Sequence, residues 1–138
     1  MKNNAPVADV MTPHPQSVQV TQPMSDVLAA LADGRLHHLP VVDGHRLVGI
    51  ISTTDLLEFG FRPRDSHEDL DERLNKNFLV SQIMQTELVT IPSDSTVRDA
   101  AQVLTTGALH AVPVVDEGQN LIGIVTSTDI VSYFLSQK

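Results

Sequence analysis

The chain of 138 residues contains no cysteine and no tryptophan, and aromatic side chains make up only 4% of it. The lack of cysteine excludes a disulfide framework and thiol chemistry. A core with so few aromatics must consist mainly of valine, isoleucine, leucine and alanine. No apolar run reaches the roughly 18 residues that a membrane-spanning helix needs. The first residues also lack the apolar stretch of a secretion signal. We therefore expect a cytoplasmic protein without membrane insertion.

Basic residues are scarce as well, because 9 lysines and arginines face 17 aspartates and glutamates and leave a net charge of −8. Such a chain has no general electrostatic attraction to nucleic acid or to an anionic membrane. The six histidines do not show the spacing of a zinc finger or of a His-Glu-x-x-His motif. No nucleophile–base pair and no glycine-rich phosphate loop stands out. We therefore expect neither a nucleic-acid partner nor enzymatic activity.

One short pattern does occur, and it occurs twice. Leu36–Asp43 followed by Leu47–Asp55 returns as Leu109–Asp116 followed by Leu121–Asp129, about 73 residues later. A repeat of this kind indicates two related units that bury their apolar faces together. Paired units create paired clefts, and clefts are where ligands bind.

The first unit reads as a strand, a helix, two strands and a second helix. Apolar side chains at i, i+3, i+4 and i+7 predict the helix, and short β-branched runs on either side of a polar turn predict a hairpin. The expected elements are extended chain over 10–23, a helix over 24–31 that ends near Gly34, strands over 39–42 and 47–51, and a helix capped by Ser52 or Thr53.

The second unit repeats this order. The expected elements are a strand over 88–91, a helix over 97–104 capped by Ser93, Asp94 or Ser95 and ended by Gly107, strands over 111–115 and 121–125, and a last helix over 126–135. These patterns predict an α+β fold of two β-α-β-β-α units, over 8–60 and 81–136. A charged linker joins them over 61–80.

In each unit a hydroxyl and a carboxylate lie where a buried strand runs into a helix. Ser52 is followed by Asp55, and Thr126 is followed by Asp129. The start of a helix presents unpaired N–H groups that favour an anion such as phosphate. A carboxylate in the first turn can accept hydrogen bonds from a ribose diol. Capping alone would also explain these residue types, but their occurrence at matched positions in both units favours contact with a ligand.

Histidines form a second group of candidate residues, just before the strands expected over 39–42 and 111–115. His37 and His110 correspond across the repeat, whereas His38 has Ala111 as its counterpart. A partly protonated imidazole can contact phosphate; alternatively, the rings pack between helix and strand. Any contact made by His38 would make the two clefts unequal.

These residues together resemble CBS domains, and the chain resembles a stand-alone tandem CBS pair, or Bateman module. The resemblance rests on three stretches in each unit: Met11-Thr-Pro and Met84-Gln-Thr at the starts, the proline-valine-valine-aspartate stretches, and the stretches that end in Asp55 and Asp129. It implies two units packed about a pseudo-two-fold axis with two clefts between them. Members of the family bind AMP, ADP, ATP or S-adenosylmethionine in such clefts.

The resemblance also implies roles for individual residues. Asp55 and Asp129 would hold ribose hydroxyls, and Ser52 and Thr126 would meet phosphate. His110 would serve the Asp55 cleft from the other unit, and His37 and His38 would serve the Asp129 cleft. The adenine pockets would be lined by the opening strand segments, partly through backbone, at Ser17, Val18, Val20, Thr90, Ile91 and Pro92.

Basic side chains around the expected clefts are few. Arg35 is the best additional phosphate contact, and Ala108 stands in its place in the second unit. The scarcity favours a mono- or diphosphate over a triphosphate, which would need a metal ion such as Mg²⁺ for charge balance. His38 and Arg35 together suggest that the Asp129 cleft binds phosphate better than the Asp55 cleft.

Three functions are compatible with these observations. The first is a non-catalytic regulatory module that senses an adenine nucleotide, needs no cofactor, and signals to a partner protein that the sequence does not identify. The second is a constitutive dimerisation or scaffold protein with empty clefts. The third is a sensor of a divalent cation such as Mg²⁺. A homodimer fits the first two, because paired modules commonly form a flat disc in this family.

Overall fold

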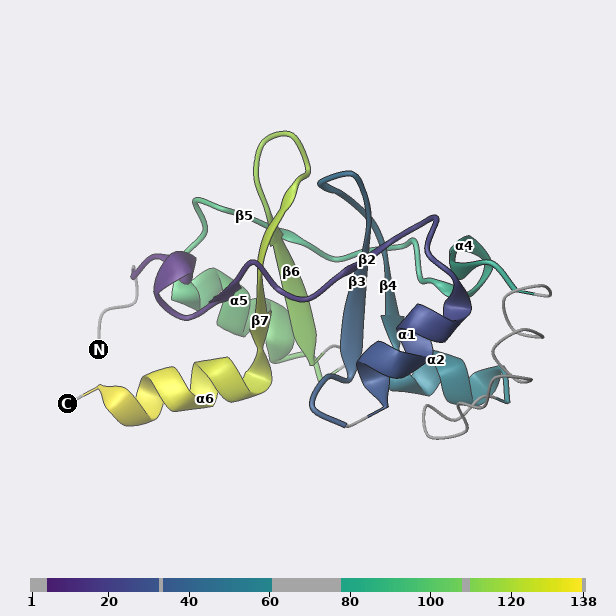
Figure 1. Ribbon diagram of the computed structural model, residues 1–138. Coiled ribbons are helices and arrows are strands. Elements are labelled where there is room, and N and C mark those ends of the chain that lie inside the picture. The colour runs from purple at the N-terminus through teal and green to yellow at the C-terminus, as the bar shows by residue number, and fades with distance from the viewer. Residues whose placement is uncertain (1–4, 33, 61–77, 108–109, 138) are drawn as a thin grey trace. The chain divides into compact units, whose positions relative to one another are not determined.

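Two compact units make up the computed structural model (Figure 1). It describes residues 5–32, 34–60, 78–107 and 110–137. We call Gln16–Leu88 the first unit, since it contains the first copy of the repeat. The second unit consists of Val89–Lys138 together with Met1–Pro15. Most of the linker predicted over 61–80 lies outside the described residues, and we retain 8–60 and 81–136 as proposed limits of the repeats.

The first unit is built on a three-stranded sheet. Strand β2 (Val18–Gln19) runs parallel to β3 (His38–Asp43), which pairs antiparallel with β4 (Arg46–Ser52). Helix α1 (Met24–Leu31) contacts β3, and α2 (Thr53–Glu58) follows β4 directly. A short helix, α4 (Val80–Ile83), completes the unit. The predicted strand–helix–strand–strand–helix order is confirmed here.

Aliphatic side chains fill the core of the first unit, as the low aromatic content predicts. The predicted apolar face of α1 is fully buried and packs against the sheet residues Leu39, Val41 and Ile51. Burial of one such side chain contributes about 1.5–3 kcal/mol. The hairpin between β3 and β4 turns at Gly44, whose φ of +69° suits a residue without Cβ.

The second unit has a four-stranded sheet in the order β1-β7-β6-β5. Strands β6 (Ala111–Val115) and β7 (Leu121–Thr126) form the predicted hairpin, and α6 (Ser127–Ser136) follows β7. Helix α5 (Val97–Leu104) packs on β6 and α6. The mixed α+β class and the repeated order of elements are therefore confirmed. Among the described residues, no helix combines the length and apolar character needed to cross a bilayer.

Two details of the second unit differ from the sequence prediction. The strand expected over 88–91 is instead β5 (Ile91–Pro92), because only these residues pair with β6. The cap of α5 is Thr96, not Ser93, Asp94 or Ser95. The Thr96 hydroxyl accepts a hydrogen bond from the Asp99 N–H at 3.1 Å, and the Asp99 carboxylate accepts one from the Thr96 N–H at 3.0 Å. This reciprocal capping box requires the three-residue spacing that only Thr96 has.

Each unit also contains a short segment that precedes the other repeat in the sequence. In the second unit, η1 (Val7–Asp9) contacts α5, and β1 (Thr12–Pro13) pairs with β7. In the first unit, Gln85 forms a bridge with Ile50 of β4. The close approach is possible because glycines on β4 and β7 make room for methionine side chains: Gly49 faces Met84 and Gly123 faces Met11.

Candidate functional site

The start of α2 carries the predicted hydroxyl and carboxylate of the first unit. Ser52 ends β4 and accepts a hydrogen bond through its hydroxyl from the Asp55 N–H at 3.1 Å. The Asp55 carboxylate in turn accepts one from the Ser52 N–H at 2.8 Å. The structure therefore brings Ser52 and Asp55 together, and only 6% of Asp55 is exposed.

The start of α6 repeats this arrangement in the second unit. The Thr126 hydroxyl accepts a hydrogen bond from the Asp129 N–H at 3.1 Å, and the Asp129 Oδ2 accepts one from the Thr126 N–H at 2.8 Å. Both side chains are half-buried. Capping thus uses only Oδ2 of each carboxylate. Oδ1 of each aspartate remains available for another hydrogen bond.

The second oxygen distinguishes the two aspartates. Oδ1 of Asp55 accepts a hydrogen bond from Nε2 of Gln85 at 2.9 Å. Among the described residues, Oδ1 of Asp129 has no hydrogen-bond partner. The residue of the second unit that corresponds to Gln85 is Thr12, which pairs with Ile124 of β7. Sequence reasoning missed Gln85, because nothing in the chain's linear order places it near Asp55.

A buried hydroxyl without a partner lies next to the first of these sites. Thr53, the first residue of α2, has an Oγ1 that is shielded from solvent and makes no hydrogen bond within the described part of the chain. Its backbone N–H donates to the His37 carbonyl at 3.0 Å. An unsatisfied buried hydroxyl costs about 1–3 kcal/mol.

The histidines lie beside the helix starts of their own units. His37 and His110 are exposed, and their carbonyls accept from the N–H groups of Thr53 and Ser127 at 3.0 and 3.1 Å. His38 is half-buried at the beginning of β3, and Arg35 is exposed in the preceding loop. The cross-unit pairing of histidines with aspartates stays a prediction from the resemblance.

The residues predicted to line adenine pockets divide into two groups. The side chains of Val18 and Ile91 belong to the buried cores of their units, so each could reach a ligand only through its backbone. The side chains of the others are half-buried or exposed, at Ser17, Val20, Thr90 and Pro92.

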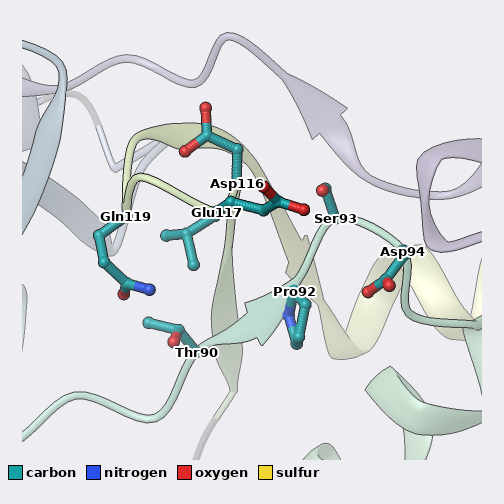
Figure 2. Close-up of a pocket in the computed structure, with 8 residues that line it drawn as sticks. Thr90, Pro92, Ser93, Asp94, Asp116, Glu117 and Gln119 are labelled. Carbon is teal, nitrogen blue, oxygen red and sulfur yellow. The ribbon is translucent and has the colours of Figure 1, made fainter.

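A pocket of about 480 Å³ lies in the second unit. Figure 2 shows the hairpin residues Asp116, Glu117 and Gln119 on one side and four residues around β5 on the other. These four are Ser93, Asp94 and the predicted adenine-lining residues Thr90 and Pro92. The pocket is near the tip of the hairpin, where Val115 pairs with Leu121. Thr126 is at the opposite end of the same hairpin, paired with Ala111.

The charge of this pocket argues against phosphate. Three carboxylates line it and no basic side chain does. The Asp116 carboxylate is held within the turn by N–H groups of Asn120 and Gly118, both at 2.9 Å. The Asn120 backbone N–H lowers the pKa of Asp116 below its ordinary value. Within the described ranges, no group of three histidine or acidic residues is arranged to hold a metal ion.

Family models, curated relatives and solved structures all match this chain to proteins of one family. The family model described as "CBS domain" matches residues 7–61 and 80–136. Protein MJ1225 of Methanocaldococcus jannaschii is 31% identical over 113 residues, which are 80% of this chain and 40% of the relative. Its crystal structure superposes with a TM-score of 0.80 and 26% identity, covering 97% of this chain and 49% of that one. The chain spans 22–42% of the length of the first five curated relatives that it matches.

Two further solved structures contain adenosine compounds. One is CBSX2, a CBS-pair protein from Arabidopsis thaliana, in complex with AMP. It has a TM-score of 0.78 and 29% identity, and the match covers 95% of this chain and 96% of that one. The other is the CBS domain pair of protein MJ0100 with 5′-methylthioadenosine and S-adenosyl-L-methionine. It has a TM-score of 0.72 and 27% identity, over 94% and 99% of the two chains. Our chain is thus a member of the CBS domain family and carries two CBS domains in tandem.

Proposed function

We propose that this protein is a non-catalytic regulatory module that senses an adenine nucleotide. One observation supports the proposal above all: Asp129 is half-buried, and its carboxylate Oδ1 has no hydrogen-bond partner among the described residues. The capping box fixes the orientation of that carboxylate, so it can accept hydrogen bonds from a ribose diol without further ordering. The relationship to CBSX2, solved with AMP, supports an adenosine compound as the ligand.

The start of α6 is suited to the phosphate of the same ligand. This helix has ten residues. The Ser127 N–H already donates to the His110 carbonyl and the Asp129 N–H to the Thr126 hydroxyl, so the groups that can donate to an anion are the Thr128 N–H and the Thr126 hydroxyl. Since the chain carries a net charge of −8, each added phosphate charge meets a less favourable potential. We therefore propose AMP as the best of the adenine nucleotides, with ATP bound only together with Mg²⁺.

We also propose that the module forms a homodimer. Helix α6 exposes an apolar stripe at i, i+3 and i+4 that consists of Val131, Phe134 and Leu135, with exposed fractions of 57%, 46% and 82%. Contiguous exposed apolar side chains mark interaction surfaces. A second copy would cover the stripe, and a cytoplasmic partner protein would read the nucleotide-dependent state of the dimer.

A thermal-unfolding series tests the proposed function. Purified protein is heated alone and with AMP, ADP, ATP, S-adenosylmethionine, 5′-methylthioadenosine or Mg²⁺. A ligand at 100 times its dissociation constant adds about 2.7 kcal/mol to stability. For a domain of this size that corresponds to a rise of roughly 10 °C in Tm. We expect the rise with AMP and its loss in Asp129→Ala.

Asp99→Ala is the matched control for this variant. Asp99 closes the same kind of capping box at α5 but does not belong to either repeated motif. Asp99→Ala should lower the Tm of the free protein yet keep the full AMP-dependent rise. If no adenosine compound raises the Tm at millimolar concentration, the proposal is wrong and the scaffold alternative is favoured. A rise with Mg²⁺ alone would instead favour the cation sensor.

A further inference from the structure

The Asp55 carboxylate of the first unit is already engaged on both oxygens. Oδ2 accepts from the Ser52 N–H at 2.8 Å and Oδ1 accepts from the Gln85 amide at 2.9 Å. With 6% of the residue exposed, little room remains for a second donor on either oxygen. A ligand hydroxyl can therefore reach Asp55 only by replacing the Gln85 amide.

The position of Gln85 is fixed by its own backbone. Its N–H donates to the Ile50 carbonyl at 2.8 Å, and its carbonyl accepts from the Ile50 N–H at 3.1 Å. The preceding residue, Met84, packs against Gly49. These contacts fix the Gln85 backbone beside β4, and from this exposed position its side-chain amide reaches Oδ1 of Asp55.

The second unit lacks this contact. Thr12 pairs with Ile124 as Gln85 pairs with Ile50, so the two residues hold equivalent positions beside their strands. The threonine side chain is shorter and makes no hydrogen bond to Asp129 within the described residues. The two copies of the motif thus have the same capping box. They differ because a neighbouring side chain donates a hydrogen bond to Oδ1 of Asp55 but not to Oδ1 of Asp129.

We propose that Gln85 masks Asp55 and thereby restricts nucleotide binding to Asp129 in the second unit. The inference rests on the proposed function, because it takes the ribose of an adenine nucleotide as the group that competes with Gln85. It makes Gln85 a specificity-determining residue. The wild-type chain therefore binds one nucleotide, at Asp129. The Asp55 carboxylate can bind a second nucleotide only when the Gln85 amide moves away from it.

Isothermal titration with AMP tests this inference through the number of molecules bound per chain. The wild type should bind one AMP, and Gln85→Ala should bind two. The added site should disappear in Gln85→Ala/Asp55→Ala, and it should persist as the single site in Gln85→Ala/Asp129→Ala. Thr12→Ala is the matched control, because it truncates the equivalent residue without unmasking a carboxylate, and it should bind one AMP.

The outcomes separate this inference from the proposed function. Two sites in the wild type, or one site in both the wild type and Gln85→Ala, would overturn the masking by Gln85 and leave the proposed function standing. No site in the wild type but one in Gln85→Ala would support masking and refute binding at Asp129. No binding in either protein would overturn both. A thermal unfolding curve for each variant verifies that it is folded before titration.

Discussion

The contact between Gly49 and Met84 predicts a measurable clash. A Cβ added at Gly49 would lie 2.8 Å from the Cγ and 3.0 Å from the Cβ of Met84, and it would also overlap the sulfur. The sulfur and Cγ can move by rotation of the side chain. The Met84 Cβ is fixed to the backbone, so Gly49→Ala forces the segment at Met84 and Gln85 away from β4.

The expected destabilisation follows from this geometry. Overpacking by one methyl group in a closely packed site costs about 1–3 kcal/mol. For a domain of this size each kcal/mol lowers the Tm by roughly 4 °C. Gly49→Ala should therefore unfold about 4–12 °C below the wild type. Without the clash, alanine in a strand would be more stable than glycine by about 0.5–1 kcal/mol, so the opposite sign would be expected.

A double-mutant cycle provides the assay. Urea unfolding is measured for Gly49→Ala, for Met84→Ala and for the double variant. Removing the methionine side chain relieves the clash, so the double variant should be more stable than the sum of the single effects predicts, by about 1 kcal/mol or more. The corresponding cycle with Gly123 and Met11 should show weaker relief, because the Thr12 carbonyl also lies 3.2 Å from an added Cβ.

Two results would contradict the packing of Met84 against Gly49. One is additivity of the Gly49 and Met84 effects, which would mean that the two residues do not touch. The other is an unchanged or raised Tm in Gly49→Ala. Either would show that the Met84–Gln85 segment does not pack on β4, and the proposed masking of Asp55 would lose its structural basis.

Three other predictions concern the core and the helix starts. Leu28→Ala removes a fully buried side chain from α1 and should lower the free energy of unfolding by about 2–5 kcal/mol, measured by urea denaturation. Ser52→Ala removes the hydroxyl that caps α2 and should lower it by about 1 kcal/mol, whereas Ser52→Thr, as in the second unit, should restore it. The Thr96 backbone N–H lowers the pKa of Asp99 below 3.8, so its contribution to stability is complete above pH 3.8 and is lost as the pH falls through the lower folded-state value. Asp99→Asn should therefore unfold at a lower temperature than the wild type at pH 7, and the difference should shrink in acid; a difference that is independent of pH would contradict the capping role.

The sequence predicted those features of the fold that depend on local pattern. The helix over 24–31 matches α1, and the hairpin strands match β3, β4, β6 and β7 to within a residue or two. These elements have strong apolar periodicity and clear turn residues, so their side chains alone determine their position. The cap at Thr96 was missed because four consecutive residues could serve as a cap, and only the reciprocal bond with Asp99 selects one.

Long-range pairing could not be predicted in the same way. Nothing in the local sequence indicates that β1 joins the sheet of the second repeat or that Gln85 pairs with Ile50. These contacts depend on space left by glycines far along the chain. For the candidate sites, the hydroxyl–carboxylate pairs were found from their spacing. An inequality between the two clefts was predicted from His38 and Arg35, but the hydrogen bond from Gln85 to Asp55, 30 residues apart in the chain, was not.

An NMR titration locates the bound nucleotide residue by residue. AMP is added to ¹⁵N-labelled protein and the shift of each backbone amide is followed. The largest saturable shifts should occur at Thr126, Ser127, Thr128 and Asp129, with little change around Asp116 in the acidic pocket. Saturable shifts confined to the pocket, or none at millimolar AMP, would contradict the account.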